Sequence, residues 1–331
     1  MTGSMRAVTQ TAYGGPDRLV LSIVERPEPD PTDVLVEVRA AAVSPGDRAM
    51  ITGVPYVNRL AARSLRHPPQ LIPGFDCAGV VEAIGTEVEG FEVGDAVFGN
   101  AAGSFAEYAV ASQDQLAPIP DGWTFDDAAT IPESGCVALQ AICDRGRVEA
   151  GQHVAIVGAG GGVGSCAVQI AKATGAHVTG VCGTRMLDGV RALGADDVVD
   201  YTTAELADSG QAYDVIVDTA GATPLRRLRS ALSESGTLVL VGADHAHRVT
   251  GGLGRWMRAV LWSPMVSQRL RPFVARPLSR EHLDQLVELM AQGRLQGCVD
   301  RTFRLEEAAD AVRHLDHRDR PGKVVVVTQP T

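Results

Sequence analysis

The sequence predicts an α/β protein in which a β-rich unit precedes a doubly wound parallel sheet. Three observations lead to this prediction. Short β-branched segments separated by Pro and Gly fill the first third of the chain. From His153 onward, apolar strand segments alternate with helical segments, as in parallel βαβ units. A glycine-rich turn connects the first of these strands to its helix. The 331 residues are enough for two domains.

The first third is expected to form a small barrel-like all-β unit. Its segments are rich in Val, Leu and Ile and partly alternate with polar residues. Pro27, Pro29 and Pro31 separate the first two segments, and glycine turns interrupt the later ones. The expected strands are 19–24, 34–38, 79–85 and 93–99.

After Pro120 the pattern changes to helices and then to alternating elements. The expected helices are 126–129, 134–145, 164–174, 186–193 and 225–228, and the expected strands are 153–157, 177–182, 197–201, 213–218 and 237–242. Apolar spacing predicts two more helices over 280–290 and 306–315, before a final strand over 323–327. We expect this tail to return to the first unit. A discontinuous domain, 1–126 with 275–331, then encloses a domain over 127–274.

The glycine-rich turn matches the dinucleotide-binding fingerprint. Ala159, Gly161 and Gly164 occupy its three small-residue positions, between an apolar strand and a helix. The small residues permit a tight turn, close approach to a pyrophosphate and close packing of helix on strand. The helix N-terminus adds unpaired N–H groups and a positive dipole end. The turn therefore predicts a bound dinucleotide.

Composition excludes several classes of function. The net charge of −10 argues against a general nucleic-acid binder. The first ten residues lack the apolar core of a signal peptide, and no apolar run is long enough for a membrane span. None of the six cysteines forms a CxxC pair, so we expect buried thiols in a reducing compartment. These observations predict a cytoplasmic enzyme.

Several motifs together resemble one family, the medium-chain dehydrogenases/reductases, and within it the zinc-free quinone oxidoreductase (zeta-crystallin-like) branch. The resemblance covers nearly the whole chain from Met5. The motifs are 44–47 (Ser-Pro-Gly-Asp), 73–81, 94–99, 103–108, 158–164, 193–196 and 322–325. The resemblance implies a GroES-like substrate domain, a Rossmann domain and a cleft between them for the nicotinamide. It also implies a homodimer joined through the edge of the Rossmann sheet.

Zinc-dependent relatives carry a Cys and a His that bind a catalytic zinc. Here Ser44 stands at the position of the Cys, and Phe75 stands at the position of the His. Neither side chain supplies the thiolate or imidazole that zinc requires. The four-cysteine lobe of those relatives is also missing between Gly99 and Tyr108. We therefore expect no metal in the chain.

The end of the second Rossmann strand favours NADPH over NADH. An NAD site places an acid there, but the first acid after strand 177–182 is Asp188. Thr184 and Arg185 instead offer groups that suit a 2′-phosphate. The resemblance places Tyr201 beside the same phosphate. The complete set of predicted cofactor-binding residues is Gly158, Ala159, Gly160, Gly161, Gly162, Val163, Gly164, Thr184, Arg185, Tyr201, Ala220, Val241, Gly242 and Lys323.

The predicted catalytic residues are Ser44, Asp47 and Tyr56. The resemblance places the first two on a loop facing the nicotinamide, where relatives often have Asn instead of Ser. Asp47 either contacts the substrate or orients its neighbours. Related enzymes have a tyrosine near Tyr56 that donates to a quinone or enone oxygen. Val137 stands where relatives often have Thr, and Glu133 and Ser134 are candidates to compensate.

The sequence leaves the roles of two further segments undecided. His245 and His247 follow the last Rossmann strand, close to where a nicotinamide would lie. Segment 253–276 mixes apolar bulk with arginines, and it lines a substrate pocket, forms the dimer edge or lies on a membrane surface. If segment 253–276 lines the substrate pocket and segment 54–69 forms the opposite wall, the pocket is apolar.

The sequence thus predicts an NADPH-dependent, zinc-independent reductase of a quinone or an α,β-unsaturated carbonyl. The expected partners are a small apolar substrate and a second copy of the chain, without nucleic acid or membrane insertion. The alternatives are an NADP-dependent alcohol dehydrogenase and a catalytically weak interaction protein that keeps the cofactor site.

Overall fold

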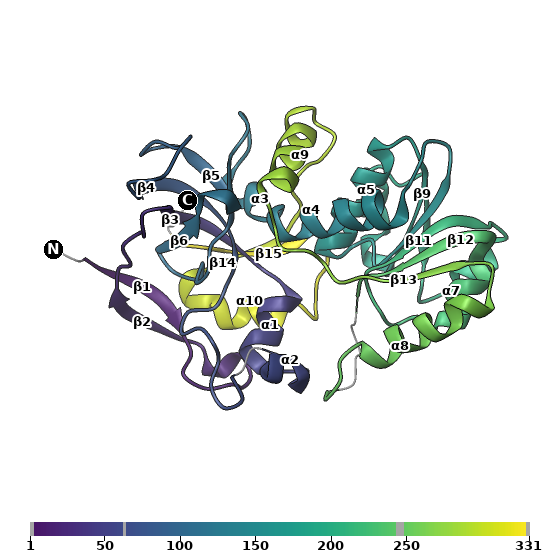
Figure 1. The fold of residues 1–331 in the computed structure, drawn as a ribbon, viewed down its shortest axis with the longest axis horizontal. Helices are drawn as coiled ribbons and strands as arrows, with labels where there is room; N and C mark the ends of the chain where they lie inside the picture. Colours follow the sequence, from purple (N-terminus) through teal and green to yellow (C-terminus); the bar gives the residue numbers. More distant parts are fainter. Residues whose placement is uncertain (1–2, 62–63, 243–247, 329–331) are drawn as a thin grey trace. The chain divides into compact units, whose positions relative to one another are not determined.

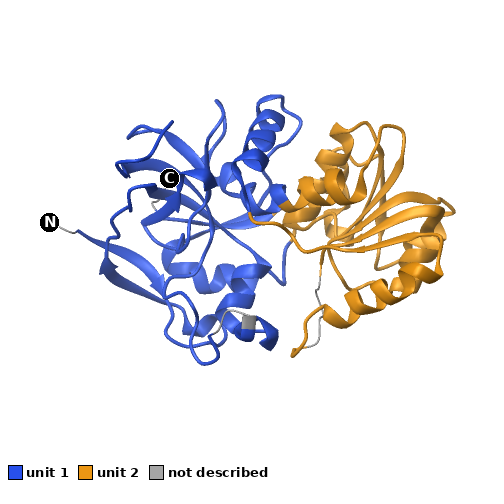
Figure 2. Ribbon diagram, in the orientation of Figure 1, with its two compact units in different colours: residues 1–136, 278–318, 323–331 blue, residues 137–277, 319–322 orange. Residues whose placement is uncertain are grey.

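A largely antiparallel sheet and a fully parallel sheet organise the chain (Figure 1). The computed structural model describes residues 3–61, 64–242 and 248–328. The two sheets belong to different compact units (Figure 2). The first unit comprises 1–136, 278–318 and 323–331, and the second comprises 137–277 and 319–322. Most of the tail of the chain therefore belongs to the first unit.

The division between the units falls inside a helix. Helix α4 spans Pro132–Leu139, whereas the sequence placed this boundary at 126/127. The second change occurs at 277/278, close to the predicted 274/275. Residues 319–322 belong with the second unit, a short excursion of the tail that nothing in the sequence indicated.

Strand β3 is the centre of the first unit. It spans Asp33–Val43 and pairs with three neighbours, β4, β6 and β15. The other strands of this seven-stranded sheet are β4 Asp76–Ile84, β5 Ala96–Asn100, β6 Tyr108–Ser112, β7 Leu116–Pro118, β14 Val299–Arg304 and β15 Lys323–Val327. Strands β1 (Ser4–Thr9) and β2 (Val20–Glu25) form a separate antiparallel pair.

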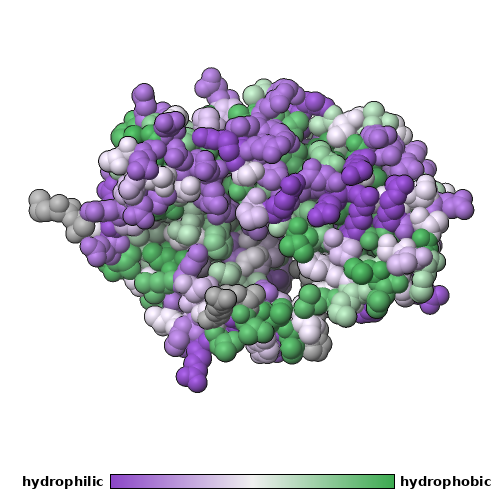
Figure 3. Space-filling view, in the orientation of Figure 1, coloured by the Kyte–Doolittle hydropathy of each residue, from purple (hydrophilic) through white to green (hydrophobic). Residues whose placement is uncertain are grey.

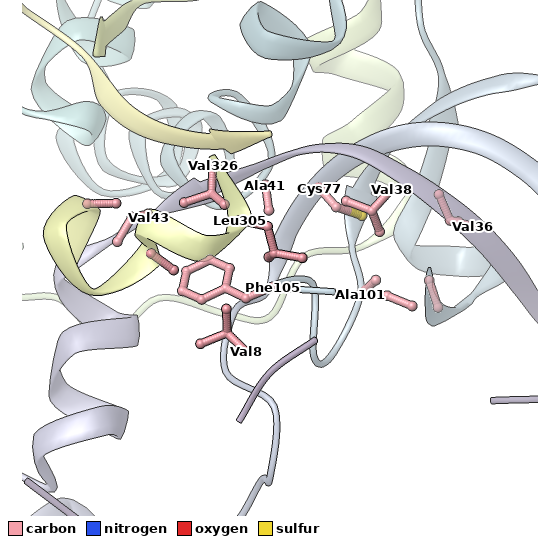
Figure 4. Packing of buried hydrophobic residues seen from close by; sticks show 14 of the residues in the cluster. Val8, Val36, Val38, Ala41, Val43, Cys77, Ala101, Phe105, Leu305 and Val326 are labelled. Carbon is pink, nitrogen blue, oxygen red and sulfur yellow. The ribbon is translucent and has the colours of Figure 1, made fainter. Parts of the chain in front are cut away.

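The core of the first unit lies against β3. Val36 and Val38 alternate inward from this strand, and Phe105, Leu305 and Val326 pack with them from other segments (Figure 4). The helices of the unit are α1 Pro45–Thr52, α2 Tyr56–Ala61, α3 Phe125–Ala129, α9 Arg280–Ala291 and α10 Ala308–His314. Burial of this apolar face fixes the register of β3, because a one-residue slip would turn it outward.

The second unit is a parallel sheet with strand order β10-β9-β8-β11-β12-β13, the order of a Rossmann fold. Its strands are β8 His153–Val157, β9 His177–Cys182, β10 Asp197–Asp200, β11 Tyr213–Asp218, β12 Leu232–Leu240 and β13 Arg269–Pro272. Its helices are α5 Gly162–Ala173, α6 Leu187–Ala192, α7 Leu225–Ala231 and α8 Leu253–Trp262. The predicted α/β class and both domain types are confirmed.

Two segments differ from expectation in a way that bears on function. Residues after Ser44 were expected as a loop, but Pro45–Thr52 form helix α1. Ser44 and Asp47 make a capping box, and Pro45 occupies the first turn. The expected helix 134–145 also changes character, since 140–146 is π-helical and ends at Arg147 in the left-handed region, with φ 52°.

Candidate functional site

The glycine turn after β8 has a backbone that only small residues permit. Gly158 has φ 86°, and a Cβ there would lie 2.6 Å from Thr219 Oγ1. The N–H groups of Gly158 and Ala159 each donate to the Val181 carbonyl at 3.0 Å, which ties the turn to β9. A Cβ on Gly164 would collide with the Gly158 carbonyl oxygen, so α5 packs directly on the turn.

The start of α5 fits an anionic group. Gly161 is the N-cap and provides no side-chain hydrogen bond to the first turn. The first N–H groups of a helix have no partner within the helix, and its dipole favours negative charge there. Gly162, Val163 and Gly164 therefore present backbone donors without bulky side chains. This cradle fits the pyrophosphate of a dinucleotide, as the sequence predicts.

Three predicted residues gather at the end of β9. Thr184 and Arg185 follow the strand directly, and a Cβ on Gly183 would lie 3.4 Å from the Tyr201 hydroxyl oxygen. The structure thus brings together the groups predicted to bind the 2′-phosphate. Arg185 is largely exposed, so its guanidinium is accessible to a ligand.

Two carboxylates that sequence reasoning missed also lie here. The Thr184 hydroxyl donates to Asp200 Oδ2 at 2.6 Å, and Arg185 pairs with Asp319. Hydrogen bonds from Thr184 and Thr202 lower the pKa of Asp200, which keeps that carboxylate ionised. Asp200 could have been found from strand register, since it pairs with Cys182 at the end of β9. Asp319 belongs to the short excursion of the tail, which has no local signal.

This excursion also contacts the glycine turn. The Gly322 N–H donates to the Gly160 carbonyl at 3.1 Å. A Cβ on Gly189 of α6 would lie 2.6 Å from Pro321 Cδ, so the tail packs tightly on that helix. Residues 319–322 therefore hold Asp319 beside Arg185 within the second unit.

The remaining predicted cofactor residues of this unit lie at the carboxyl ends of β11 and β12, the edge where such sheets bind ligands. Val241 and Gly242 each donate a backbone N–H to the Asp218 carbonyl, at 3.0 and 2.9 Å. A Cβ on Gly158 would lie 3.1 Å from the Ala220 backbone nitrogen, so Ala220 lies against the glycine turn. His245 and His247 lie outside the described residues.

Asp218 is also the anchor for α8. Its carboxylate is fully buried and pairs with Arg255, which donates to the Thr223 carbonyl at 2.9 Å as well. This ion pair was not predicted. Figure 3 shows hydrophobic side chains at the surface over α8, and Met257, Val260 and Leu261 are exposed there. The rest of segment 253–276 includes β13, an edge strand of the sheet, so both the pocket and the dimer prediction for it stay open.

The first unit contains a cluster of ionisable side chains around Ser44. The Ser44 hydroxyl donates to Asp47 Oδ2 at 2.7 Å, and the Asp47 N–H donates back to Ser44 Oγ at 3.1 Å. Asp47 is buried, and its Oδ1 has no hydrogen-bond partner among the described residues. The two residues predicted to be catalytic, Ser44 and Asp47, are therefore hydrogen-bonded to each other. These hydrogen bonds cap the N-terminus of α1.

Lys323 completes this cluster from the far end of the chain. Its ammonium group is buried and pairs with Asp76, the first residue of β4. Asp76 Oδ1 also accepts the Glu133 N–H at 3.1 Å. A Cβ on Gly46 would lie 3.2 Å from Ser44 Oγ and 3.7 Å from Glu133 Oε1, so Glu133 lies over the start of α1. The structure gives Lys323 a carboxylate partner, and its predicted contact with the cofactor stays a prediction.

Three carboxyl groups share one cation in this cluster, and the pKa values of Asp47, Glu133 and Lys323 are raised. Burial is the largest effect on Asp47 and raises its pKa to about 6, against hydrogen bonds from Ser44 and the charge of Lys323. Burial and then the charge of Asp76 raise the pKa of Glu133 to about 7. Burial alone would lower the pKa of Lys323, but the surrounding carboxylates together raise it. Lys323 therefore stays charged.

Tyr56 lies apart from these contacts, on α2. Its side chain is 42% exposed, and the Arg59 guanidinium lies 4.9 Å from its ring centroid. The same guanidinium lies 4.2 Å from the ring centroid of Tyr13. The predicted role of Tyr56 as a hydrogen-bond donor to substrate stays a prediction.

Neither a metal cluster nor a membrane helix is found within 3–61, 64–242 and 248–328. No group of three or more His, Cys, Asp or Glu side chains in this part could hold a metal ion. No helix there is both long and apolar enough to cross a bilayer. The predicted cytoplasmic location, homodimer and lack of nucleic-acid binding stay predictions.

Comparison with known proteins identifies the family. Residues 30–121 match the family described as "Alcohol dehydrogenase GroES-like domain", and residues 193–326 match the one described as "Zinc-binding dehydrogenase". The chloroplast envelope quinone oxidoreductase homolog of Arabidopsis thaliana is 31% identical, over 97% of this chain and 98% of its own. The trans-enoyl reductase pgmF of Aspergillus terreus is 33% identical over 91% of this chain and 88% of its own.

The fold of one solved structure matches the fold of this chain over nearly its whole length. The quinone oxidoreductase from Coxiella burnetii superposes with a TM-score of 0.84 at 27% identity, and the match covers 99% of this chain and 100% of the other. The chain therefore belongs to the medium-chain dehydrogenase/reductase superfamily of oxidoreductases, in its quinone oxidoreductase branch.

Proposed function

We propose that this protein is an NADPH-dependent reductase that transfers a hydride to a quinone or an α,β-unsaturated carbonyl. The observation that carries the proposal is the grouping of Thr184, Arg185 and Tyr201 beside a glycine cradle that fits a pyrophosphate. Relatives named as quinone oxidoreductase and trans-enoyl reductase support the substrate class. The match of residues 193–326 to the family described as "Zinc-binding dehydrogenase" supports a nicotinamide dinucleotide as the reductant.

Binding of NADPH requires Arg185 to donate to the 2′-phosphate in place of Asp319. Both side chains of this pair are more than half exposed. Exposed ion pairs contribute only about 0–1 kcal/mol, so the exchange costs little. A charge-assisted hydrogen bond to a phosphate is stronger than a neutral one, which favours the exchange.

When bound, the reduced nicotinamide supplies the hydride. The protein contributes position and charge. The glycine turn and the start of α5 hold the pyrophosphate through backbone N–H groups. Ser44 offers a hydroxyl, which Asp47 Oδ2 holds by accepting a hydrogen bond from it, with 2.7 Å between the two oxygen atoms. Tyr56, exposed on α2, is the proposed donor to the substrate oxygen.

The residue types at the zinc positions fit this reaction. Ser44 and Phe75 supply neither thiolate nor imidazole, so the chain lacks the ligands that would stabilise the alkoxide of a simple alcohol. Reduction of an activated C=C or a quinone places charge on a conjugated oxygen instead. Hydrogen-bond donors or solvent can stabilise that charge.

The test is NADPH consumption against a panel of quinones and enones, with NADH and a simple alcohol plus NADP⁺ in parallel. We expect turnover with at least one quinone or enone and a higher kcat/KM for NADPH than for NADH. Turnover confined to the alcohol would identify a dehydrogenase and contradict the proposal. Cofactor binding without turnover on any acceptor would favour an interaction protein.

A further inference from the structure

The cluster in the first unit holds more carboxyl groups than its single cation can neutralise. Asp47, Asp76 and Lys323 are nearly inaccessible to solvent, whereas the side chain of Glu133 is exposed. Ionisation of all three carboxyl groups would leave two negative charges without a partner. A buried unpaired charge is costly, so the cluster favours retention of a proton.

The contacts decide which carboxyl group holds the exchangeable proton. Asp76 accepts from the Lys323 ammonium and the Glu133 N–H, which stabilises it as a carboxylate. Asp47 accepts the Ser44 N–H and hydroxyl on one oxygen, both at 2.7 Å, and is sealed from solvent. Glu133 is the member of the cluster that solvent reaches.

The groups facing Glu133 come from three elements. Asp76 on β4 and Asp47 on α1 raise its pKa through their charge, while the charge of Lys323 on β15 lowers it. Partial burial of the carboxyl group has the largest effect on this pKa and raises it. A group with a pKa near neutrality exchanges protons efficiently at physiological pH.

We propose that Glu133 is the proton donor that completes the reduction, a role that rests on the proposed function. A hydride from the bound nicotinamide forms the new C–H bond at the β-carbon of an enone, and the C=C electron pair moves to give an enolate. The O–H bond of Glu133 then breaks, and its proton goes to the enolate. The Glu133 carboxylate recovers a proton from solvent. Ser44, Asp47, Asp76 and Lys323 act as positioning residues that set its charge.

The experiment compares Glu133→Gln with a matched control, Glu89→Gln, which makes the same change on an exposed loop of the first unit. General acid catalysis contributes about 10²–10⁴-fold. We expect Glu133→Gln to lower kcat on an enone by about 10²-fold with an unchanged Kd for NADPH. The wild-type rate should fall as pH rises through about 7, since the protonated form is active, and this fall should disappear in Glu133→Gln.

The outcomes separate the two proposals. A wild-type enzyme that reduces no quinone or enone contradicts the proposed function, independently of Glu133. An active wild type whose rate and pH profile are unchanged in Glu133→Gln overturns the role of Glu133 alone. If Glu133→Gln does not fold, the pH profile and the solvent isotope effect of the wild-type enzyme test the role of Glu133. A flat kcat profile across pH 7 with no solvent isotope effect overturns the role, and a fall near pH 7 with an isotope effect supports it.

Discussion

The Lys323 ammonium and the Asp76 carboxylate pair in the interior of the first unit, although 247 residues separate them in sequence. Lys323 begins β15 and Asp76 begins β4, and both strands flank β3. The pair therefore joins the tail of the chain to its first third at a point sealed from water. Its contribution to folding depends on both partners being present.

Replacing Lys323 with Met should destabilise the protein strongly. The change leaves Asp76 buried without its cation, and removal of one partner of a buried pair costs about 3–5 kcal/mol. Urea denaturation monitored by circular dichroism would measure the free energy of unfolding. The control is Arg191→Met, because Arg191 pairs with Asp188 at the surface and should change stability by less than about 1 kcal/mol. Equal effects of the two substitutions would contradict a stabilising role for the buried pair.

Ionisation of Asp47 should lower the free energy of unfolding as pH rises. Its pKa is about 6 in the folded state and 3.8 for an ordinary Asp, so the folded protein binds the proton more tightly than the unfolded chain does. That stabilisation is complete below pH 4 and is lost as pH rises to about 6. A shift of this size corresponds to a loss on the order of 3 kcal/mol. Unfolding measured across this range should show a flatter profile in Asp47→Asn.

The Asn side chain keeps an oxygen for the Ser44 hydroxyl but does not titrate, so it isolates the ionisation. Carboxyl groups outside the cluster titrate alike in both proteins and cancel, and Glu133→Gln introduced into both removes the one other raised pKa that Asp47 influences. If Asp47→Asn and the wild type lose stability in parallel between pH 4 and 6, the buried carboxyl group is not the cause.

The glycine turn provides a sharp steric test. A Cβ on Gly164 would overlap the backbone carbonyl of Gly158, which cannot rotate away as a side chain would. We expect Gly164→Ala to destabilise the second unit by roughly 1–3 kcal/mol and to weaken cofactor binding, because α5 must move off the turn. Gly254→Ala, in α8, is the control, since a Cβ there meets nothing within 4 Å. Thermal denaturation and NADPH titration measure both effects; unchanged values in Gly164→Ala would contradict the close packing.

The parallel sheet was readable from sequence because its central strands are buried on both faces. Strands β8, β9 and β11 are mostly apolar and buried along most of their length, and their predicted bounds agree with the structure. Strand β14 was missed because its residues are partly or fully exposed and mostly polar, so pairing with β15 alone makes it a strand. Helix α1 was missed although Ser44 and Asp47 are spaced as a capping box, because Gly46 in the first turn weakens the helical pattern.

The site residues likewise include some that the sequence predicted and some that only the structure brings together. Ser44 and Asp47 were predicted because a local motif contains both. Asp76, Glu133 and Lys323 come from three distant segments, and packing of strands around β3 brings their side chains together. Glu133 was noticed only as a candidate to compensate for Val137. Sequence spacing alone carries no signal that these groups share one cation.

The pair of Arg185 and Asp319 should tune the choice between NADPH and NADH. Arg185→Ala would remove the proposed charge-assisted contact to the 2′-phosphate, worth about 1.5–3 kcal/mol, so the Kd for NADPH should rise about 10- to 100-fold. The Kd for NADH, which lacks this phosphate, should change little. Asp319→Asn frees Arg185 and removes a negative charge beside the phosphate. Because the pair is exposed, we expect only a two- to five-fold tighter Kd for NADPH.

Asp188→Asn is the control for Asp319→Asn, because it makes the same charge change on exposed Asp188, whose partner is Arg191. It should leave both cofactor affinities unchanged. Fluorescence titration of each protein with the two reduced cofactors gives every Kd under one salt condition. An equal loss of NADPH and NADH binding in Arg185→Ala would mean that Arg185 supports the fold of the loop after β9. In that case it would not read the phosphate, and the preference for NADPH would lose its main support.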